Sequence, residues 1–319
     1  MKVLQSLRRG RGIEAKLEAE ARRNVDVGLQ TALSYEGPSG GYAWYSTHEE
    51  DAALTAMALE MYADIAQVRP FDQQAIARAQ RFLLAALGDE KTPNALFCYA
   101  VRALVNSGLK REELEPFMRE ISKRLPTMSD SYEVAQAAAA LAAADPGAAE
   151  TAKVLKRLEE LAAGDPAHWT TGEPSLFHAS GPAADVETTG VAAAALLRRD
   201  PSSGTAAHAL AWLASKRGAD GTWGSTAATV AALSAFLAAD EPAAGANCEA
   251  GVRLRDVEIR VAIPAKDDGV TRTAEFGSAC PLVPGDNGAS MFSTGPCASF
   301  AQLVVAYRRP WGARPAGEA

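Results

Sequence analysis

The stretch that decides the fold is Asp-Val-Glu-Thr-Thr-Gly-Val-Ala-Ala-Ala-Ala-Leu-Leu at residues 185–197. A similar stretch, Asp-Gly-Thr-Trp-Gly-Ser-Thr-Ala-Ala-Thr-Val-Ala-Ala-Leu, follows at residues 220–233. Both pass from small polar residues into an uncharged, alanine-rich run, and a helix made from such a run must be buried on every side. Asp185 and Ser225 are predicted N-caps, because their side chains accept hydrogen bonds from the free N–H groups of a first helical turn.

Segments of this apolar kind alternate along the chain with amphipathic ones. The amphipathic segments are residues 14–33, 72–87, 111–125, 147–163 and 202–216. The apolar segments are residues 51–65, 94–106, 131–144, 187–197 and 225–239. Their starts recur roughly every 36–55 residues, a period typical of helical-hairpin arrays. The alternation predicts a mainly α protein, an α/α toroid of about five helical hairpins with apolar inner helices and amphipathic outer helices.

Three connections between an amphipathic and an apolar segment are unusual. Residues 34–50 and 164–184 are long, aromatic and rich in Gly and Pro, and residues 218–224 form a shorter version. The alternation of the helices predicts that all three lie at one rim of the toroid. We expect functional residues there, because loops on a rigid scaffold carry many binding and catalytic groups.

The character of the sequence changes after residue 240. Helix-capping signals end, residues 257–263 alternate apolar and polar side chains, and residues 302–307 form a second strand-like run. The sequence therefore predicts three parts: a toroid at residues 1–240, a small β-sandwich domain at residues 248–311 and a tail at residues 312–319.

Charge and hydropathy argue against two classes of function. The 319 residues carry a net charge of −7, so no basic field attracts nucleic acid or an anionic membrane. Charges and prolines break the alanine-rich runs well short of the roughly 18 residues that a membrane span needs, so we expect no membrane insertion. The apolar stretch within residues 1–9 is too short, and charged residues follow it too early, for a signal peptide. We therefore expect a cytosolic chain or a piece of a longer protein.

The redox state of the four cysteines stays open. Cys98 lies in a helical segment and is expected to be a small buried hydrophobe. Cys248, Cys280 and Cys297 fall in the last third, as candidates for one disulfide in an oxidising compartment or for three reduced thiols. Their spacing fits no zinc motif, and we predict no metal or cofactor.

Several of these stretches together resemble the thioester domain of the alpha-2-macroglobulin and complement family. The resemblance rests first on residues 185–197 and 220–233, in this order and at this separation. Gly-Gly-Tyr-Ala-Trp-Tyr at residues 40–45 and Ser-Tyr-Glu-Val-Ala at residues 131–135 are most similar to the bacterial branch. Tyr-Arg-Arg-Pro-Trp at residues 307–311 is similar to the end of the CUB-type β region around that domain. The resemblance extends over most of the chain.

The resemblance implies a protease-trapping inhibitor rather than an enzyme. In such proteins a Cys-Gly-Glu-Gln motif forms an internal thioester, which a nucleophile on the attacking protease captures after cleavage of a bait region. The stored acyl group is shielded from water until the conformation changes. Bacterial relatives are typically periplasmic or on the cell surface, where cysteines such as Cys248, Cys280 and Cys297 can form disulfides.

The sequence departs from the family pattern in one respect, because no Cys-Gly-Glu-Gln occurs in the 319 residues. Residues 3–10 resemble the stretch that follows this motif, so we expect a fragment, or one half of a trap whose motif is encoded separately. The chain as given is not expected to form a thioester. The implied partners are proteases, met through the parent protein, and the remaining macroglobulin domains. We also expect self-association at an apolar seam left by an incomplete first helix pair.

Candidate site residues lie mainly in the predicted rim loops: His48, Trp44, Tyr45, His168, Trp169, His178, Glu187 and Trp223. The histidines are interpreted either as a thioester-assisting imidazole, with His48 nearest by position, or as solvated loop residues. The tryptophans are interpreted either as lids over the inner helices or as a ligand platform. Glu187 is predicted to belong to a helix cap and first turn.

Two other functions stay open from the residues alone. Class II terpene cyclases are also α/α barrels, and Asp-Val-Glu-Thr at residues 185–188 is similar to their Asp-x-Asp-Asp acid motif, with Glu187 as the acid. However, Thr188 replaces the last carboxylate, and aromatic residues that would stabilise a carbocation are few. The other alternative is a non-catalytic protein-binding module that holds a partner on its rim or concave surface.

Overall fold

The computed structural model describes residues 15–45, 49–67, 69–243, 248–263, 276 and 287–294. The chain divides into two compact units, residues 1–243 and 244–319. The described part of the first unit is helical, and that of the second contains a three-stranded antiparallel sheet. The predicted class, mainly α with helical hairpins followed by a small β region, is confirmed.

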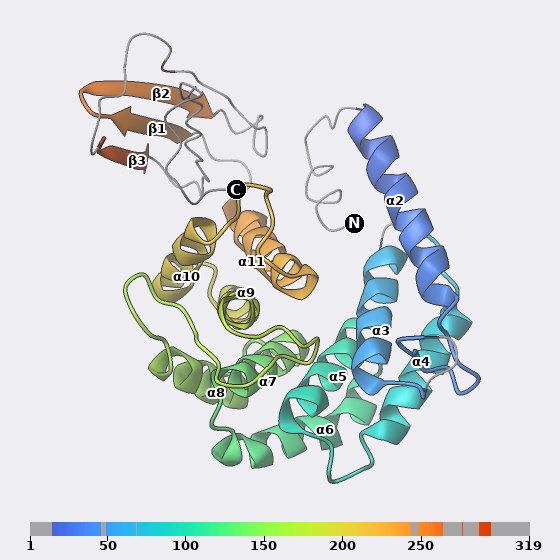
Figure 1. Cartoon of the computed structure of the whole chain (residues 1–319). Coiled ribbons are helices and arrows are strands. Elements are labelled where there is room, and N and C mark those ends of the chain that lie inside the picture. Colours follow the sequence, from blue (N-terminus) through green and yellow to red (C-terminus); the bar gives the residue numbers. More distant parts are fainter. Residues whose placement is uncertain are drawn as a thin grey trace, which may run out of the picture. The chain divides into compact units, whose positions relative to one another are not determined.

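The helical unit consists of an inner and an outer set of helices (Figure 1). The inner helices are α3 (Ala52–Ala66), α5 (Asn94–Asn106), α7 (Ser131–Ala144), α9 (Pro182–Arg199) and α11 (Thr226–Ala243), and they pack side by side in this order. The outer helices are α2 (Ala15–Leu33), α4 (Gln73–Ala86), α6 (Arg111–Arg124), α8 (Ala149–Glu160) and α10 (Gly204–Ser215). From α4 onward, each outer helix packs behind the inner helix that precedes it. A 3-10 turn, η1 (Leu125–Thr127), follows α6.

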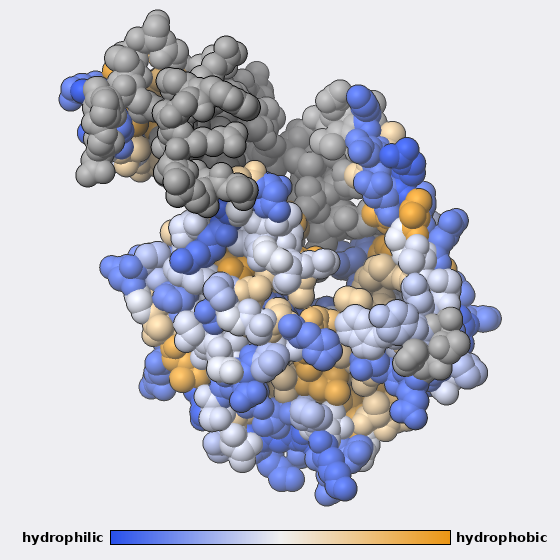
Figure 2. Space-filling view, in the orientation of Figure 1, coloured by the Kyte–Doolittle hydropathy of each residue, from blue (hydrophilic) through white to orange (hydrophobic). Residues whose placement is uncertain are grey.

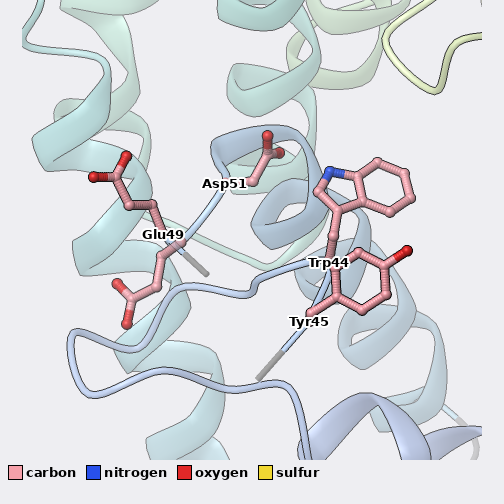
Figure 3. A pocket seen from close by; sticks show the side chains of 5 residues that line it. Trp44, Tyr45, Glu49 and Asp51 are labelled. Atoms are coloured by element: carbon pink, nitrogen blue, oxygen red, sulfur yellow. The ribbon is translucent and has the colours of Figure 1, made fainter. Parts of the chain in front are cut away.

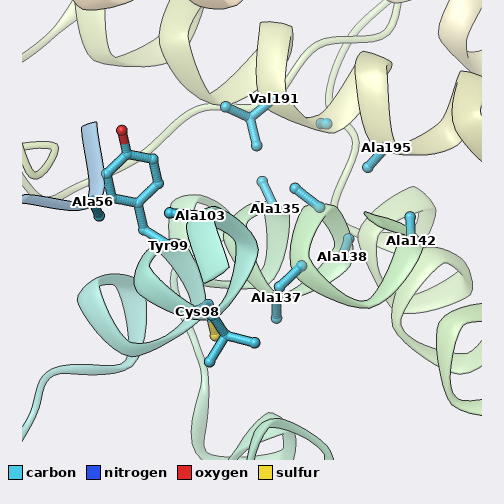
Figure 4. Close-up of a cluster of buried hydrophobic side chains, with 14 of the residues drawn as sticks. Ala56, Cys98, Tyr99, Ala103, Ala135, Ala137, Ala138, Ala142, Val191 and Ala195 are labelled. Carbon is cyan, nitrogen blue, oxygen red and sulfur yellow. The ribbon is translucent and has the colours of Figure 1, made fainter. Parts of the chain in front are cut away.

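Small residues let the inner helices approach one another closely. Every residue of α7 from Val134 to Ala142 is buried, and Figure 4 shows small side chains of α5, α7 and α9 gathered between these helices. Cys98 of α5 is buried, as expected, and its thiol is free. At Gly190 of α9, a Cβ atom would lie 2.6 Å from the backbone of Ala231 in α11. The contacts between inner helices therefore include many small residues, for which the fit of each atom matters.

The predicted cap Ser225 is present, because it accepts from Ala228 N at 3.1 Å. Asp51 caps α3 in the same way and accepts from Leu54 N at 2.9 Å. The prediction for Asp185 is wrong, because α9 begins at Pro182 and Asp185 lies inside its first turn. Proline favours the first position of a helix, since its φ is already helical and its missing N–H needs no partner there.

The two ends of the inner series differ from its middle. The helices α5, α7 and α9 each pack between two other inner helices. The two end helices, α3 and α11, each pack against one inner neighbour, α5 and α9 respectively, and no comparable packing joins them to each other among the described residues. Met57 of α3 is 46 % exposed, and Val230 and Leu233 of α11 are 58 % and 40 % exposed. These residues are the apolar surface on which self-association would rest. Figure 2 shows hydrophobic residues around the centre of this unit and hydrophilic residues over much of its outside.

The second unit contains the strands β1 (Cys248–Leu254), β2 (Val257–Ile263) and β3 (Ala289–Thr294) in the antiparallel order β2-β1-β3. The strand predicted at residues 257–263 is therefore present as β2. Gly251 of β1 pairs with Arg260 of β2 and with Phe292 of β3. A Cβ atom at Gly251 would overlap the ring of Phe292, so the absence of a side chain makes room for that ring.

Several predictions fall on residues that the structure does not describe. These are the strand at residues 302–307, the motif at residues 307–311, the tail at residues 312–319, and Cys280 and Cys297. The disulfide and the CUB-type region therefore stay predictions. In the described ranges, no helix has both the length and the apolar character that crossing a membrane requires.

Candidate functional site

The three rim loops are attached to the inner helices by one repeated hydrogen bond, which we call the threonine pin. In each loop, a threonine hydroxyl of the inner helix accepts from an aromatic residue's backbone N–H: Tyr42 to Thr55 (2.9 Å), Trp169 to Thr189 (3.1 Å) and Trp223 to Thr229 (3.1 Å). Each threonine stands four positions after an Asp or Ser, namely Asp51, Asp185 and Ser225. The sequence blocks that carry the resemblance are thus the places where loops attach to the scaffold.

Two of the pinned residues are buried tryptophans. Trp169 is fully buried, and its indole N–H donates to the carbonyl of Leu158 in α8 at 2.7 Å. Trp223 is 5 % exposed, and its indole N–H donates to the carbonyl of Leu213 in α10 at 2.7 Å. Because each ring reaches from a rim loop to an outer helix, it joins the two helix layers. Neither indole N–H is left for a ligand.

The first rim loop exposes its aromatic side chains instead. Trp44 is 47 % and Tyr45 is 65 % exposed, and both line an open pocket with Glu49, Glu50 and Asp51. Figure 3 shows the two rings on one side of this pocket and the Glu49 carboxylate on the other. Asp51 is already used as the N-cap of α3. Exposed aromatic faces next to carboxylates suit a cationic group.

The two described rim histidines have different surroundings. The His168 ring stacks on Trp212 of α10, with a centroid separation of 4.6 Å and an interplanar angle of 5°. His178 is exposed, has a φ of 61° and lies 6.0 Å, between ring centroids, from Trp44. The structure thus brings His178 to the first rim loop and His168 to the outer helices. His48 lies outside the described residues. Within the described ranges, no three His, Cys, Asp or Glu side chains are grouped to hold a metal ion.

Glu187 lies deeper than the sequence predicts. Because α9 begins at Pro182, Glu187 falls in the second turn, not in a cap or first turn, and it is only 4 % exposed. Its Oε1 accepts a hydrogen bond from the Tyr132 hydroxyl of α7 at 2.9 Å. Its Oε2 has no hydrogen-bond partner among the described residues. Burial raises the pKa of this carboxyl, while Ser175, Tyr132 and Arg102 act in the opposite direction.

A line of polar residues crosses the inner helices next to Glu187. Arg102 of α5 donates to Glu60 of α3 at 2.8 Å and to Gln136 of α7 at 3.2 Å. Its guanidinium lies 4.8 Å from the centre of the Tyr99 ring. Glu60, Arg102 and Gln136 are scattered within otherwise apolar runs, so none stands out in the sequence. The available signal is that such a residue recurs in successive apolar segments.

Comparison with known families gives one match. The family model described as the A-macroglobulin TED domain matches residues 1–92 and 111–238. The interval between the two matched ranges contains α5. No curated protein matches the chain. The matched ranges include all three rim loops, all three threonine pins and Glu187.

Proposed function

The chain belongs to the A-macroglobulin TED-domain family, and from this membership we propose that it is the thioester-domain part of a protease-trapping inhibitor and not an enzyme. The observation that carries the proposal is the match itself, which extends over both blocks of the original resemblance, residues 185–197 and 220–233. The bacterial type of the parent protein and a periplasmic or cell-surface location belong to the same proposal.

The chemistry of such a trap depends on a stored electrophile. A nucleophile on the captured protease attacks the acyl carbon, the carbon–sulfur bond breaks, and the released thiolate takes up the proton that the nucleophile loses. The 319 residues contain no Cys-Gly-Glu-Gln. The part that these residues play in trapping is therefore that of a scaffold and a rim, while the electrophile comes from a segment that carries the motif.

The rim is suited to this part because its loops differ in how firmly they are held. Trp169 and Trp223 join the rim to the outer helices through buried hydrogen bonds. Trp44 and Tyr45 are exposed, with His178 beside Trp44. We propose that the buried rings keep the rim rigid and that the exposed ones face the protein that is trapped.

A second candidate function is a non-covalent protein-binding module. It is favoured by the open pocket of Trp44 and Tyr45 with three acidic side chains, which suits a lysine or arginine side chain of a partner. The terpene cyclase alternative has less support. Glu187 is buried, and the hydroxyl of Thr188, which stands in place of the last carboxylate, donates to the carbonyl of Ala184.

An immunoblot of extract from the source cells distinguishes the two candidates. Antibodies against residues 15–243 would follow the native protein after addition of a serine protease. Trapping predicts an upward shift on a denaturing gel, lost after pretreatment with methylamine, which consumes thioesters. The same protease with its active-site serine blocked is the control and should give no shift. A complex seen only under native conditions would support the binding module and overturn the trap.

A further inference from the structure

The second rim loop, residues 164–181, forms a strap over the ends of the inner helices. Glycines stand at both of its ends, Gly164 with a φ of 73° and Gly181 with a φ of 55°. Positive φ angles are readily adopted by glycine and rarely by other residues, so these two positions can act as pivots. His178, within the strap, also has a positive φ of 61°, which strains a residue with a side chain.

The first half of the strap, residues 164–172, is held by many contacts. Trp169 is fixed by its threonine pin and its indole hydrogen bond. Thr171 donates its backbone N–H to Asp185 at 3.0 Å and its hydroxyl to Asp130 at 2.9 Å. Gly172 N also donates to Asp130. These contacts tie this half to α7, α8 and α9.

The second half of the strap, residues 173–181, has fewer contacts with the scaffold. Ser175 and Ala179 bond mainly to each other, through Ser175 N to Ala179 O at 2.8 Å and Ala179 N to Ser175 Oγ at 3.2 Å. Phe177 packs edge-on against Tyr99 of α5. A hydrogen bond from Leu176 N to the Tyr132 hydroxyl, at 3.4 Å, joins this half to the inner helix α7.

The Tyr132 hydroxyl connects the strap to Glu187. A phenol has one proton to donate, and here the oxygen accepts from Leu176 N while the proton is donated to Glu187 Oε1. The carboxyl is thus the last member of a chain that begins at the strap backbone. Its other oxygen, Oε2, lacks a hydrogen-bond partner in the described structure, although Glu187 is more than nine-tenths buried.

We propose that Glu187 is a proton-controlled latch, which holds residues 173–181 against α7 while its carboxyl is protonated and releases them when it ionises. A buried carboxylate needs several hydrogen-bond donors, but here Oε1 accepts from Tyr132 and Oε2 has no partner in the described structure. Ser175 of the strap favours the ionised form, but burial outweighs it. Opening the second half of the strap admits water to Oε2. Ionisation therefore favours the open form.

The other charged groups around Glu187 do not replace the missing donor. Arg102, on α5, favours the ionised form, but its guanidinium is paired with Glu60 and Gln136. On α7, Asp130 is bound to the strap, and on α9 so is Asp185. Tyr99 and Tyr132 stay neutral, since burial raises the pKa of both phenols. His178, on the strap itself, is exposed.

The sign of the pH dependence follows from the direction of the pKa shift. Burial raises the pKa of Glu187 in the closed structure above the ordinary carboxyl value, and the latch requires that the pKa falls back towards that value when the strap opens and water reaches the carboxyl. The latch is therefore fully closed below the ordinary carboxyl range and weakens as the pH rises through the raised value. Acid closes the strap, and neutral pH favours opening.

Hydrogen exchange at the Leu176 amide tests the latch. The full chain and its Glu187→Gln variant would be compared in the same buffers from about pH 4.5 to about pH 8. Glutamine keeps an oxygen for Tyr132 and cannot ionise, so the ratio of wild-type to variant exchange rates isolates Glu187. The ratio is expected to be near one in acid and to rise up to about tenfold per pH unit above it. A ratio that is constant with pH would overturn the proposal.

Two more variants keep the test decisive. Glu173→Gln changes an exposed carboxyl of the same strap and should keep the wild-type pH profile. Tyr132→Phe removes the hydroxyl, so Leu176 should exchange fast at every pH, while the amide of Trp169, in the first half of the strap, stays slow. If Glu187→Gln fails to fold, the ratio of Leu176 to Trp169 exchange within the wild-type chain gives the same answer. Slow exchange at Leu176 in Tyr132→Phe would contradict the latch.

Discussion

The middle and the ends of the inner helix series are made of similar sequences but have different surroundings. α7 has inner neighbours on both sides, and Val134 to Ala142 are all buried. α11 packs against α9 on one side and exposes Val230 and Leu233. An apolar run therefore specifies a helix whose side chains favour burial, while the number of neighbouring helices in the fold decides how much of its surface is buried. Four substitution experiments test this difference.

The largest effect is expected from truncating the same residue type at the two places. Leu141 of α7 is 2 % exposed, so Leu141→Ala should lower the free energy of unfolding by about 2–5 kcal/mol. Leu233 of α11 is 40 % exposed, and Leu233→Ala should cost less than about 0.5 kcal/mol. Denaturant titration measures both values. Equal losses would mean that α11 is enclosed as fully as α7.

The next effect concerns the contact between α11 and its inner neighbour α9. Gly190→Ala adds a Cβ atom 2.6 Å from the backbone of Ala231, which cannot move aside as a side chain can. We expect a loss of about 1–3 kcal/mol. Gly204→Ala at the start of α10 is the matched control, since nothing lies within 4 Å of its Cβ position. Thermal unfolding of the two variants checks this, and a Gly190→Ala protein as stable as the control would refute the close contact.

A smaller effect is expected from the charge buried in the middle of the series. The raised pKa of Glu187 means that ionisation destabilises the folded state, so wild-type stability should fall as the pH rises above the ordinary carboxyl range. Glu187→Gln should remove this part of the pH dependence and be relatively more stable at neutral pH than in acid. Urea titrations of both proteins across the pH range measure the difference. Parallel pH profiles would show that Glu187 ionises without cost.

The smallest effect on the free energy of unfolding is expected at α11, the exposed end of the inner helix series. A substitution there should nevertheless change self-association measurably. Val230→Lys should change the free energy of unfolding by no more than about 0.5 kcal/mol, while reducing concentration-dependent self-association. Val27→Lys on α2 is a control at the same exposure, 58 %, away from α11. Sedimentation velocity over a range of concentrations compares the three proteins. A wild-type chain that stays monomeric, or an equal effect of Val27→Lys, would count against an apolar seam on α11.

The helices were predictable because each apolar run is long and uninterrupted. The segments predicted at residues 94–106 and 131–144 form α5 and α7 with the predicted bounds. The start of α9 was missed by three to five residues, since Gly181 and Pro182 read equally well as the end of a loop. That shift moved Glu187 from a predicted helix start to a buried second turn.

The contacts of the rim were much less predictable than its location. The threonine pins join residues that are up to 20 positions apart, as in Trp169 and Thr189, and a single sequence does not record such pairs. The repeated spacing of an Asp or Ser four positions before each threonine is a signal that could have revealed them. Nothing in the sequence predicts that His178 lies beside Trp44, because that contact depends on the path of two loops.

The threonine pin also affects how the domain can change over evolutionary time. In all three loops the pinned aromatic residue follows the end of the outer helix by eight or nine positions, whereas its threonine lies 13, 20 or 6 positions further along the chain. Length and composition between the pinned aromatic residue and the threonine can therefore vary without moving the inner helix that follows. The loop segments of the rim can therefore be exchanged while the bond to the inner helix stays the same. New recognition surfaces can arise, or be grafted, in this way while the helical core keeps its packing.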